Sequence, residues 1–298
     1  MSLHNDFAYL ANDIIKDILE LFLNPQNLKS GLFDNILKIN GPWSAVVKNY
    51  SYLEFLHSDQ GYELIVCTGN EPGRGVLPRD AGKSDRVRNT VCSDSLPKLR
   101  DLHFLLPLMT DRLSIRGTLK ELNSMLELFP VSFSELVITG RNYSTHVDEV
   151  RKLENLLTER LKSRHLRSFI CYLPNQPDQE FTSLDDSFRC LVTKPDFEEL
   201  TTNFAIGFNV IIAAIETWRA RPNFTVLGQK IKVSFRTPHG AELEWMKRTF
   251  PDWTTASSAA WKWTEPHPTD PDRCLKIGVS SDSRRIGIQF CYAPQDER

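Results

Sequence analysis

The hydrophobic pattern is clearest near the start of the chain, where apolar residues recur at helical spacing. Over residues 9–23 they fall at i, i+4 and i+8 on two adjacent stripes. Asn24-Pro25 ends this pattern, because proline disfavours a helical conformation for the residue before it. Shorter apolar runs, broken by Gly41-Pro42, continue to residue 50. Residues 1–52 therefore predict a small helical module.

Beyond residue 53 the pattern changes to short apolar strands that alternate with helices. Residues 112–117 and 135–140 align at an offset of 23, and a third strand is predicted at 166–172. Helical spacing of apolar residues predicts helices over 119–129 and 148–163. This order predicts a parallel sheet backed by helices, so residues 53–298 are expected to form a mixed α/β body.

The C-terminal part has the period-two alternation that is typical of antiparallel strands. Residues 188–192 predict a further strand and residues 208–220 a helix. Later strands are predicted at 230–235, 261–263, 275–279 and 285–290, with a short helix over 242–250. Because residues 281–283 supply a turn, the last two strands are expected to pair and to close the end of the sheet.

A polar segment rich in glycine and proline separates a predicted strand at 62–68 from the alternating units. Residues 69–98 predict an exposed loop or a partly disordered insertion. Arginine and lysine outnumber acidic residues over 74–100, which leaves RNA or phosphate binding as a weak hypothesis beside a solvated surface. Residues 81–84 are similar to the end of a phosphate loop, but Leu77 occupies the position of the required glycine.

Composition and charge narrow the class of protein. The chain has 298 residues with 41% hydrophobic and 25% charged side chains, which is ordinary for a folded domain. A net charge of -2 disfavours a nucleic-acid binder that acts through its overall field. The N-terminus does not resemble a secretory signal, and the apolar stretch 204–218 is too short to span a membrane. We expect a cytoplasmic or nuclear protein without a cofactor.

Candidate catalytic chemistry is sparse. The seven histidines show no metal-ligand spacing, and no nucleophile elbow or dinucleotide fingerprint is present. The six cysteines are scattered, so we expect thiols packed as small apolar groups rather than disulfides or zinc ligands: Cys67, Cys92, Cys171, Cys190, Cys274 and Cys291. A Cys–His nucleophile pair stays open, since such partners meet only in space.

Four tryptophans gather in the C-terminal part of the chain, at positions 245, 253, 261 and 263. Exposed tryptophans often anchor interfaces. Packing in a C-terminal core is the alternative, and the sequence favours it.

Two parts of the chain resemble known families. Residues 133–142 and 166–175 approximate the LxxLxLxxN rhythm of leucine-rich repeats, with the asparagine one place late. Residues 9–50 resemble a degenerate F-box, although Ala11 replaces the usual proline. The whole chain is similar to the large nematode group of F-box-like proteins with a divergent repeat body, and residues 218–224 resemble its Trp-x-x-x-Pro-Asn-Phe segment.

The resemblance implies a non-enzymatic protein-interaction adaptor. The module would dock a Skp1-type linker, and the body would present an unknown substrate protein to a cullin-based ubiquitin ligase. The contact residues that the family pattern implies are Leu10, Ile14, Ile15, Ile18, Leu19, Leu28 and Trp43. Three alternatives remain: packing of these seven against the sheet, a plain interaction scaffold, and a cryptic Cys/His enzyme. Neither nucleic acid nor membrane is expected as a partner.

Overall fold

The computed structural model shows a mixed α/β protein, as the pattern predicts. It describes residues 51–58, 61–68, 71–76, 87–93, 106, 109–129, 132–141, 147–173, 181–221, 230–236, 240–250, 261–270, 272–280 and 285–292. The chain forms two compact units, Met1–Ser114 and Ile115–Arg298. The expected helical module of residues 1–52 lies almost wholly outside the described residues, so its fold and its boundary with the body stay predictions.

The described part of the first unit consists of strands. β1 (Ser51–Ser58) pairs antiparallel with β2 (Gly61–Thr68), which pairs antiparallel with β3 (Glu71–Val76). β4 (Val87–Ser93) pairs parallel with β1. The predicted strand at 62–68 is confirmed.

The expectation of a polar loop over 69–98 is wrong for the residues that form β3 and β4. The sequence of β3, EPGRGV, has no alternating apolar residues, so main-chain pairing with β2 makes it a strand. In β4 the buried residues Thr90 and Cys92 do alternate, but charges on both sides hide so short a pattern.

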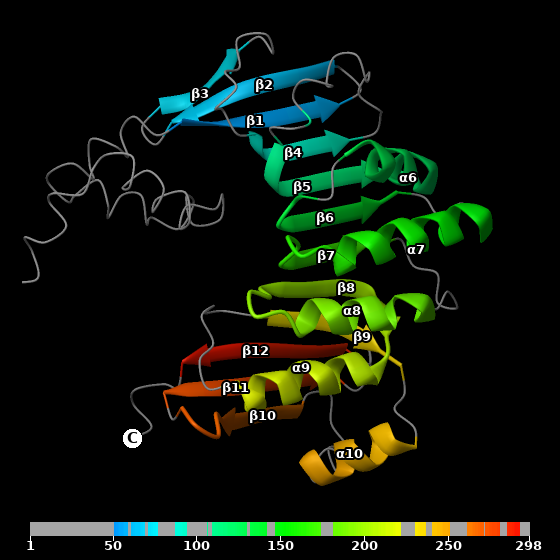
Figure 1. The fold of residues 1–298 in the computed structure, drawn as a ribbon, viewed down its shortest axis with the longest axis vertical. Coiled ribbons are helices and arrows are strands. Elements are labelled where there is room, and N and C mark those ends of the chain that lie inside the picture. The colour runs from blue at the N-terminus through cyan, green and yellow to red at the C-terminus, as the bar shows by residue number, and fades with distance from the viewer. Residues whose placement is uncertain are drawn as a thin grey trace, which may run out of the picture. The chain divides into compact units, whose positions relative to one another are not determined.

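The second unit contains strand–helix units in chain order (Figure 1). β5 (Met109–Gly117) spans the boundary between the units and leads into α6 (Leu119–Leu128). The later elements are β6 (Glu135–Gly140), α7 (Val147–Lys162), β7 (Ser168–Tyr172), the 3-10 turn Thr182–Leu184, α8 (Asp185–Val192), β8 (Glu199–Ile206), α9 (Phe208–Ala220) and β9 (Lys230–Phe235). Strands β6 to β9 are parallel neighbours.

Antiparallel strands close this sheet, as expected. After α10 (Ala241–Thr249), the strands β10 (Trp261–Pro266), β11 (Arg273–Ser280) and β12 (Arg285–Tyr292) follow. β12 pairs with β9, β11 with β12, and β10 with β11. The strand order is therefore β6-β7-β8-β9-β12-β11-β10.

The predicted strand at 188–192 is wrong, because these residues end helix α8. Phe188, Leu191 and Val192 fit one face of a helix, but a short apolar run is equally compatible with a strand. The strand at this place in the sheet is β8, which begins seven residues after the last residue of α8. Its central Thr201 and Thr202 are polar although buried, so hydrophobicity alone does not reveal it.

One face of the sheet and the helices α6 to α9 form the core of the second unit (Figure 1). A row of paired residues crosses every strand from β6 to β10: Leu136, Phe169, Leu200, Ile231, Ile288, Ile277 and Trp263. The first six are buried, and Phe169 packs against Phe188 of α8 at 5.8 Å between ring centroids. Because side chains alternate between the two faces along each strand, this apolar row faces the helices.

The helix ends of this layer are satisfied locally. Helix α6 begins with a capping box, in which Thr118 Oγ1 accepts from Glu121 N–H at 3.4 Å and Glu121 Oε2 accepts from Thr118 N–H at 2.7 Å. At its other end, the buried Arg160 of α7 donates to the carbonyls of Leu126 and Phe129.

This capping by a later side chain recurs along the layer. Lys194, after α8, donates to the carbonyls of Leu161, Ser163 and Leu166 at 2.5–3.1 Å. Arg221, after α9, donates to the carbonyl of Thr193. His267 Nε2 donates to the carbonyl of Trp218 at 2.9 Å. Carbonyls at helix ends lack intrahelical donors. Here they accept hydrogen bonds from side chains of the next segment along the chain.

Candidate functional site

The face of the second sheet that points away from the helices is polar. The row next to the apolar one is Glu135, Ser168, Glu199, Lys230, Gln289, Lys276 and Thr264, again paired strand to strand. Since successive side chains of a strand point to opposite faces, this row lies on the face opposite the core row. We call this surface the polar face.

The parallel half of the polar face contains a row of buried polar residues. Glu135, Ser168 and Glu199 are buried. The Glu199 carboxylate forms an ion pair with Lys230 Nζ at 2.9 Å and accepts from Thr201 Oγ1 at 2.8 Å. Burial raises the pKa of the adjacent Glu198, with the nearby Arg167 opposing this effect. A buried carboxylate that has its own partners is a structural feature rather than a ligand site.

The antiparallel half of the polar face is open. Lys232, Lys276 and Gln289 are exposed, and Gly278 lies opposite Gly287 between β11 and β12. Among the described residues, a Cβ atom added to Gly278 would meet nothing within 4 Å, and one added to Gly287 would meet only a carbonyl oxygen at 4.0 Å. The two glycines therefore leave room for a methyl group beside the exposed lysines.

The two lysines of this half, Lys232 and Lys276, form no ion pair with any described residue. Their Cα positions are two strands and about two residues apart, or roughly 12 Å from ordinary strand geometry. An extended anionic segment can span that separation. We call Lys232, Lys276, Gln289 and the two glycines the lysine patch.

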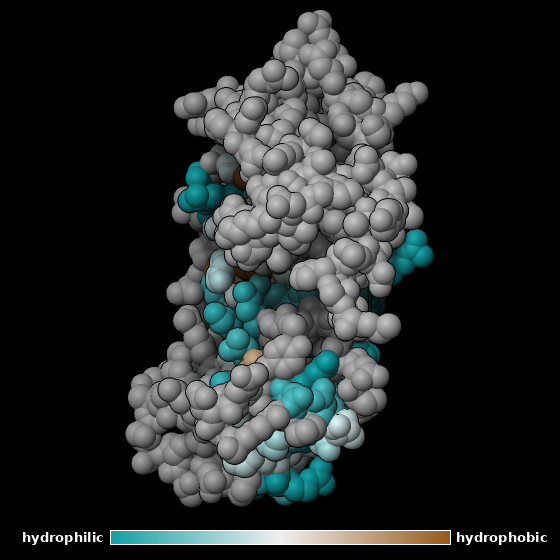
Figure 2. Space-filling view, turned by 90° about the vertical axis from the view of Figure 1, so that its left-hand side faces the viewer, coloured by the Kyte–Doolittle hydropathy of each residue, from teal (hydrophilic) through white to brown (hydrophobic). Residues whose placement is uncertain are grey.

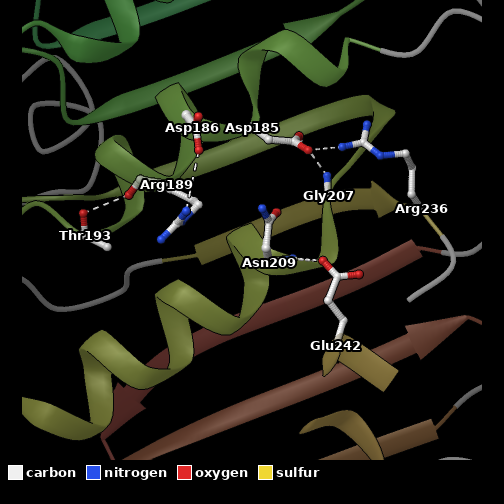
Figure 3. Close-up of polar contacts among 8 residues, drawn as sticks. All are labelled: Asp185, Asp186, Arg189, Thr193, Gly207, Asn209, Arg236 and Glu242. Atoms are coloured by element: carbon white, nitrogen blue, oxygen red, sulfur yellow. Dashed lines mark hydrogen bonds and ion pairs between the residues drawn. The ribbon is translucent and has the colours of Figure 1, made fainter. Parts of the chain in front are cut away.

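A second polar cluster lies where strands β8 and β9 end (Figure 3). The Asp185 carboxylate accepts from Gly207 N–H at 2.9 Å and forms an ion pair with Arg236. Arg236 also donates to the carbonyl of Ala205 at 3.2 Å. The Glu242 carboxylate accepts from Asn209 N–H at 3.1 Å. The carboxyl ends of parallel strands are where α/β proteins most often bind ligands, so this cluster is a candidate.

The contacts of this cluster indicate a structural role. Asp185 and Glu242 bind N–H groups at the start of α9, where helix ends lack internal partners. A Cβ on Gly207 would meet Asp185 Oδ2 at 2.3 Å, so the close approach requires glycine. Burial raises the pKa of Asp185, although the Gly207 N–H and Arg236 oppose the shift. The two carboxylates therefore fix the β8–α9 turn.

The predicted partner-binding residues cannot be placed relative to this geometry. Leu10, Ile14, Ile15, Ile18, Leu19, Leu28 and Trp43 all lie outside the described residues, as does the phosphate-loop-like segment 81–84. Of the basic stretch 74–100, only the parts in β3 and β4 are described.

Several cysteines and histidines have structural surroundings. Burial raises the pKa of Cys92 to about 12 and raises that of Cys171 as well, the reverse of what an activated nucleophile needs. His267 Nδ1 accepts from Thr269 N–H at 3.2 Å, while its Nε2 caps α9. Burial lowers the pKa of His57, which stacks against Phe55. These four groups do not form a nucleophilic site.

Two of the tryptophans pack with other aromatic rings. Phe250 lies 5.7 Å from Trp245 and 5.9 Å from Trp263 between ring centroids. Trp245 Nε1 also donates to Glu216 at 3.0 Å. These contacts support the packing interpretation for both residues. Trp253 lies outside the described residues.

The lysine patch was not identified from the sequence, although its signals are present. The alternation over 230–235 places Lys230 and Lys232 on one side of a strand. The turn at 281–283 fixes the pairing of its flanking strands, and so the position of Gly278 opposite Gly287. What the sequence does not show is that β9 and β12 are neighbours, because β10 and β11 come between them in the chain.

Hydrophilic residues dominate the described surface in Figure 2. The large hydrophobic side chains that are exposed in the described part are Val147 and Tyr172. None of the helices in that part is long and apolar enough to cross a membrane. No protein-family model matches the chain, and no curated protein does so either. The F-box and repeat resemblances therefore stand on the residues that carry them.

Proposed function

We propose that the protein is a non-enzymatic interaction adaptor that binds an acidic segment of a partner protein on the lysine patch. The observation that carries this proposal is the contrast within the polar face. In its parallel half the carboxylate of Glu199 is paired, while in its antiparallel half Lys232 and Lys276 are exposed beside two glycines that carry no side chain. Complementary charge steers association and selects partners.

The resemblance of residues 9–50 to an F-box supplies the second part of the proposal. The N-terminal module docks a Skp1-type linker, and the leucine-rich-repeat-like body acts as substrate receptor of a cullin-based ubiquitin ligase. The strand–helix order of the second unit supports this assignment, since repeat bodies use an extended sheet face for binding. A plain scaffold without Skp1 binding is the alternative.

Co-purification with a Skp1-type protein tests the linker part. We expect the wild-type chain to bind and the Ile14→Asp/Ile18→Asp variant to lose binding, because both isoleucines share one stripe of the predicted helix. Val147→Asp is the matched control, since this side chain is 67% exposed. Circular dichroism checks that each variant is folded. A wild-type chain that does not bind Skp1 overturns the ligase assignment and leaves the scaffold.

Binding of a labelled peptide of alternating glutamate and serine tests the lysine patch. We expect salt-sensitive binding that weakens about tenfold in Lys232→Gln/Lys276→Gln, a loss of about 1.4 kcal/mol. Lys152→Gln/Lys247→Gln makes the same change in net charge on helices α7 and α10. Equal weakening in both double variants would mean that net charge alone attracts the peptide, and the lysine patch would not be the site.

A further inference from the structure

We propose that Cys274 and Cys291 are an oxidation site, at which a peroxide converts two thiols into a reversible disulfide. This inference does not depend on the adaptor function. The two residues are 17 positions apart in the sequence and come from strands β11 and β12. Neither stands in a CxxC motif, so no cysteine motif marks the pair.

The pairing of β11 with β12 brings the two thiols together. Cys274 and Cys291 are direct cross-strand partners, four positions along β11 from the opposed glycines Gly278 and Gly287. Their sulfur atoms lie 3.4 Å apart and share a hydrogen bond in which either thiol can donate. Formation of a disulfide requires the two sulfurs to approach to about 2.05 Å, a small movement for neighbouring strands.

The surroundings of the pair suit a small oxidant. Cys291 is half-buried, so a peroxide can reach its sulfur, while Cys274 is buried at 3% exposure beside it. Their neighbours in the sequence, Leu275 and Phe290, are paired with each other and face the core. Since side chains alternate along a strand, Cys274 and Cys291 both lie on the polar face. Cys291 is therefore the thiol that is attacked first, and Cys274 is the thiol that resolves the product.

The chemistry balances with one peroxide molecule. The Cys291 thiolate attacks one oxygen of hydrogen peroxide, which breaks the O–O bond and gives a sulfenic acid and hydroxide. Cys274 then attacks the sulfenic sulfur and expels the second hydroxide, so that the S–S bond forms. The two thiol protons leave in two molecules of water. Two sulfurs have been oxidised by one electron each, and the peroxide has been reduced by two electrons.

The other cysteines described in the structure lack this arrangement. Cys92 and Cys171 are buried, and burial raises the pKa of both thiols. Cys190 on α8 is exposed and serves as an internal reference for simple accessibility. A thiol that reacts faster than Cys190 while being less exposed owes its reactivity to its partner.

Peptide mapping of the full chain tests the proposal without any mutation. Trypsin is expected to release residues 274–276 and 286–298, each of which contains a single cysteine. After about one equivalent of hydrogen peroxide and alkylation of remaining thiols, we expect these two peptides to be joined and to separate on reduction with dithiothreitol. At a fixed peroxide concentration in excess over the protein, the rate should not depend on protein concentration, because the bond forms within one chain.

Two variants complete the test. Cys291→Ser should abolish the linked peptide, and Cys190→Ser should leave it unchanged. If Cys291→Ser fails to fold, the comparison within the wild type still decides, because residues 274–276 and 286–298 must lose alkylation before Cys190 does. The proposal is overturned if peroxide modifies Cys190 first, or if peptides 274–276 and 286–298 remain separately alkylated.

Discussion

The two faces of the second sheet differ sharply although their residues alternate along the same strands. On the helix side, the row through Leu136, Phe169 and Leu200 is fully covered by helices. One residue earlier in each strand, Glu135, Ser168 and Glu199 form a polar row on the opposite face. This row runs on to the exposed Gln289, Lys276 and Thr264 of β12, β11 and β10.

The difference separates residues that hold the fold from residues that are available for binding. A substitution in the core row removes buried apolar contacts and leaves a cavity. A substitution in the open half of the polar face removes no buried contact and leaves no cavity. Such a substitution should therefore change binding without changing stability. The predictions below test this division, beginning with the largest expected effect on the free energy of unfolding.

Phe169→Ala should destabilise the protein by about 3–5 kcal/mol, because it removes a completely buried ring that packs on Phe188. Tyr172→Ala on the same strand is the control, since Tyr172 is 47% exposed. Its loss should stay below about 1 kcal/mol. Urea denaturation measures both values. Similar losses for the two variants would show that the faces of β7 do not differ energetically.

Lys194→Met should cost about 1–3 kcal/mol, because three main-chain carbonyls at the end of α7 lose their shared donor. Methionine keeps the apolar stem, so lost packing contributes little. Lys232→Met on the polar face is the matched control, and its effect should stay within about 0.5 kcal/mol. A cost for Lys194→Met no larger than that of the control would mean that water replaces the ammonium.

The sequence predicts the parts of this architecture that depend on local pattern. Helices over 119–129, 148–163 and 208–220 are confirmed because each repeats apolar residues at helical spacing. The strand β8 is missed because its buried threonines look polar. The caps made by Arg160 and Lys194 could not be predicted, since each reaches a carbonyl about 30 residues away that only the tertiary fold brings close.

The candidate sites depend even more on the fold. The opposition of Cys274 to Cys291 follows from the pairing of β11 with β12, which the turn at 281–283 makes predictable in outline. The distance between the sulfurs does not follow from any pattern. The lysine patch joins β9 to β12 and β11, and that adjacency is set by the way the chain returns after β11.

The contribution of Asp185 and Glu198 to stability should fall as pH rises from about 4 toward neutrality. Burial raises the pKa of both Asp185 and Glu198 above their ordinary values. The folded state therefore binds protons more tightly than the unfolded chain, so its stability is greatest below the ordinary carboxyl pKa and declines through the raised one.

Asp185→Asn should flatten this part of the pH profile, because it removes one of the two titrating groups. Glu244→Gln is the control, since this carboxylate is 74% exposed and is not one of the charges that shift the pKa of Asp185. Urea denaturation at a series of pH values gives the slopes. The interpretation depends on the slope and not on the absolute stability, because Asp185→Asn also breaks the ion pair with Arg236. An unchanged slope would contradict the assignment.

The last prediction contrasts Gly278→Ala on the polar face with Gly207→Ala in the tightly packed β8–α9 turn. A methyl group on Gly278 meets none of the described residues within 4 Å, so the substitution should not destabilise the protein and should add about 0.4–1 kcal/mol by restricting the unfolded chain. The same methyl group on Gly207 meets Asp185 Oδ2 and Asn209 Oδ1 at 2.3 and 2.5 Å, and should cost about 1–3 kcal/mol.

Since the space above Gly278 is where an extended acidic peptide would lie, Gly278→Ala should weaken binding of the glutamate–serine peptide without destabilising the protein. Unchanged peptide binding would move the binding site away from β11, whereas a loss of stability would show that the polar face is packed after all.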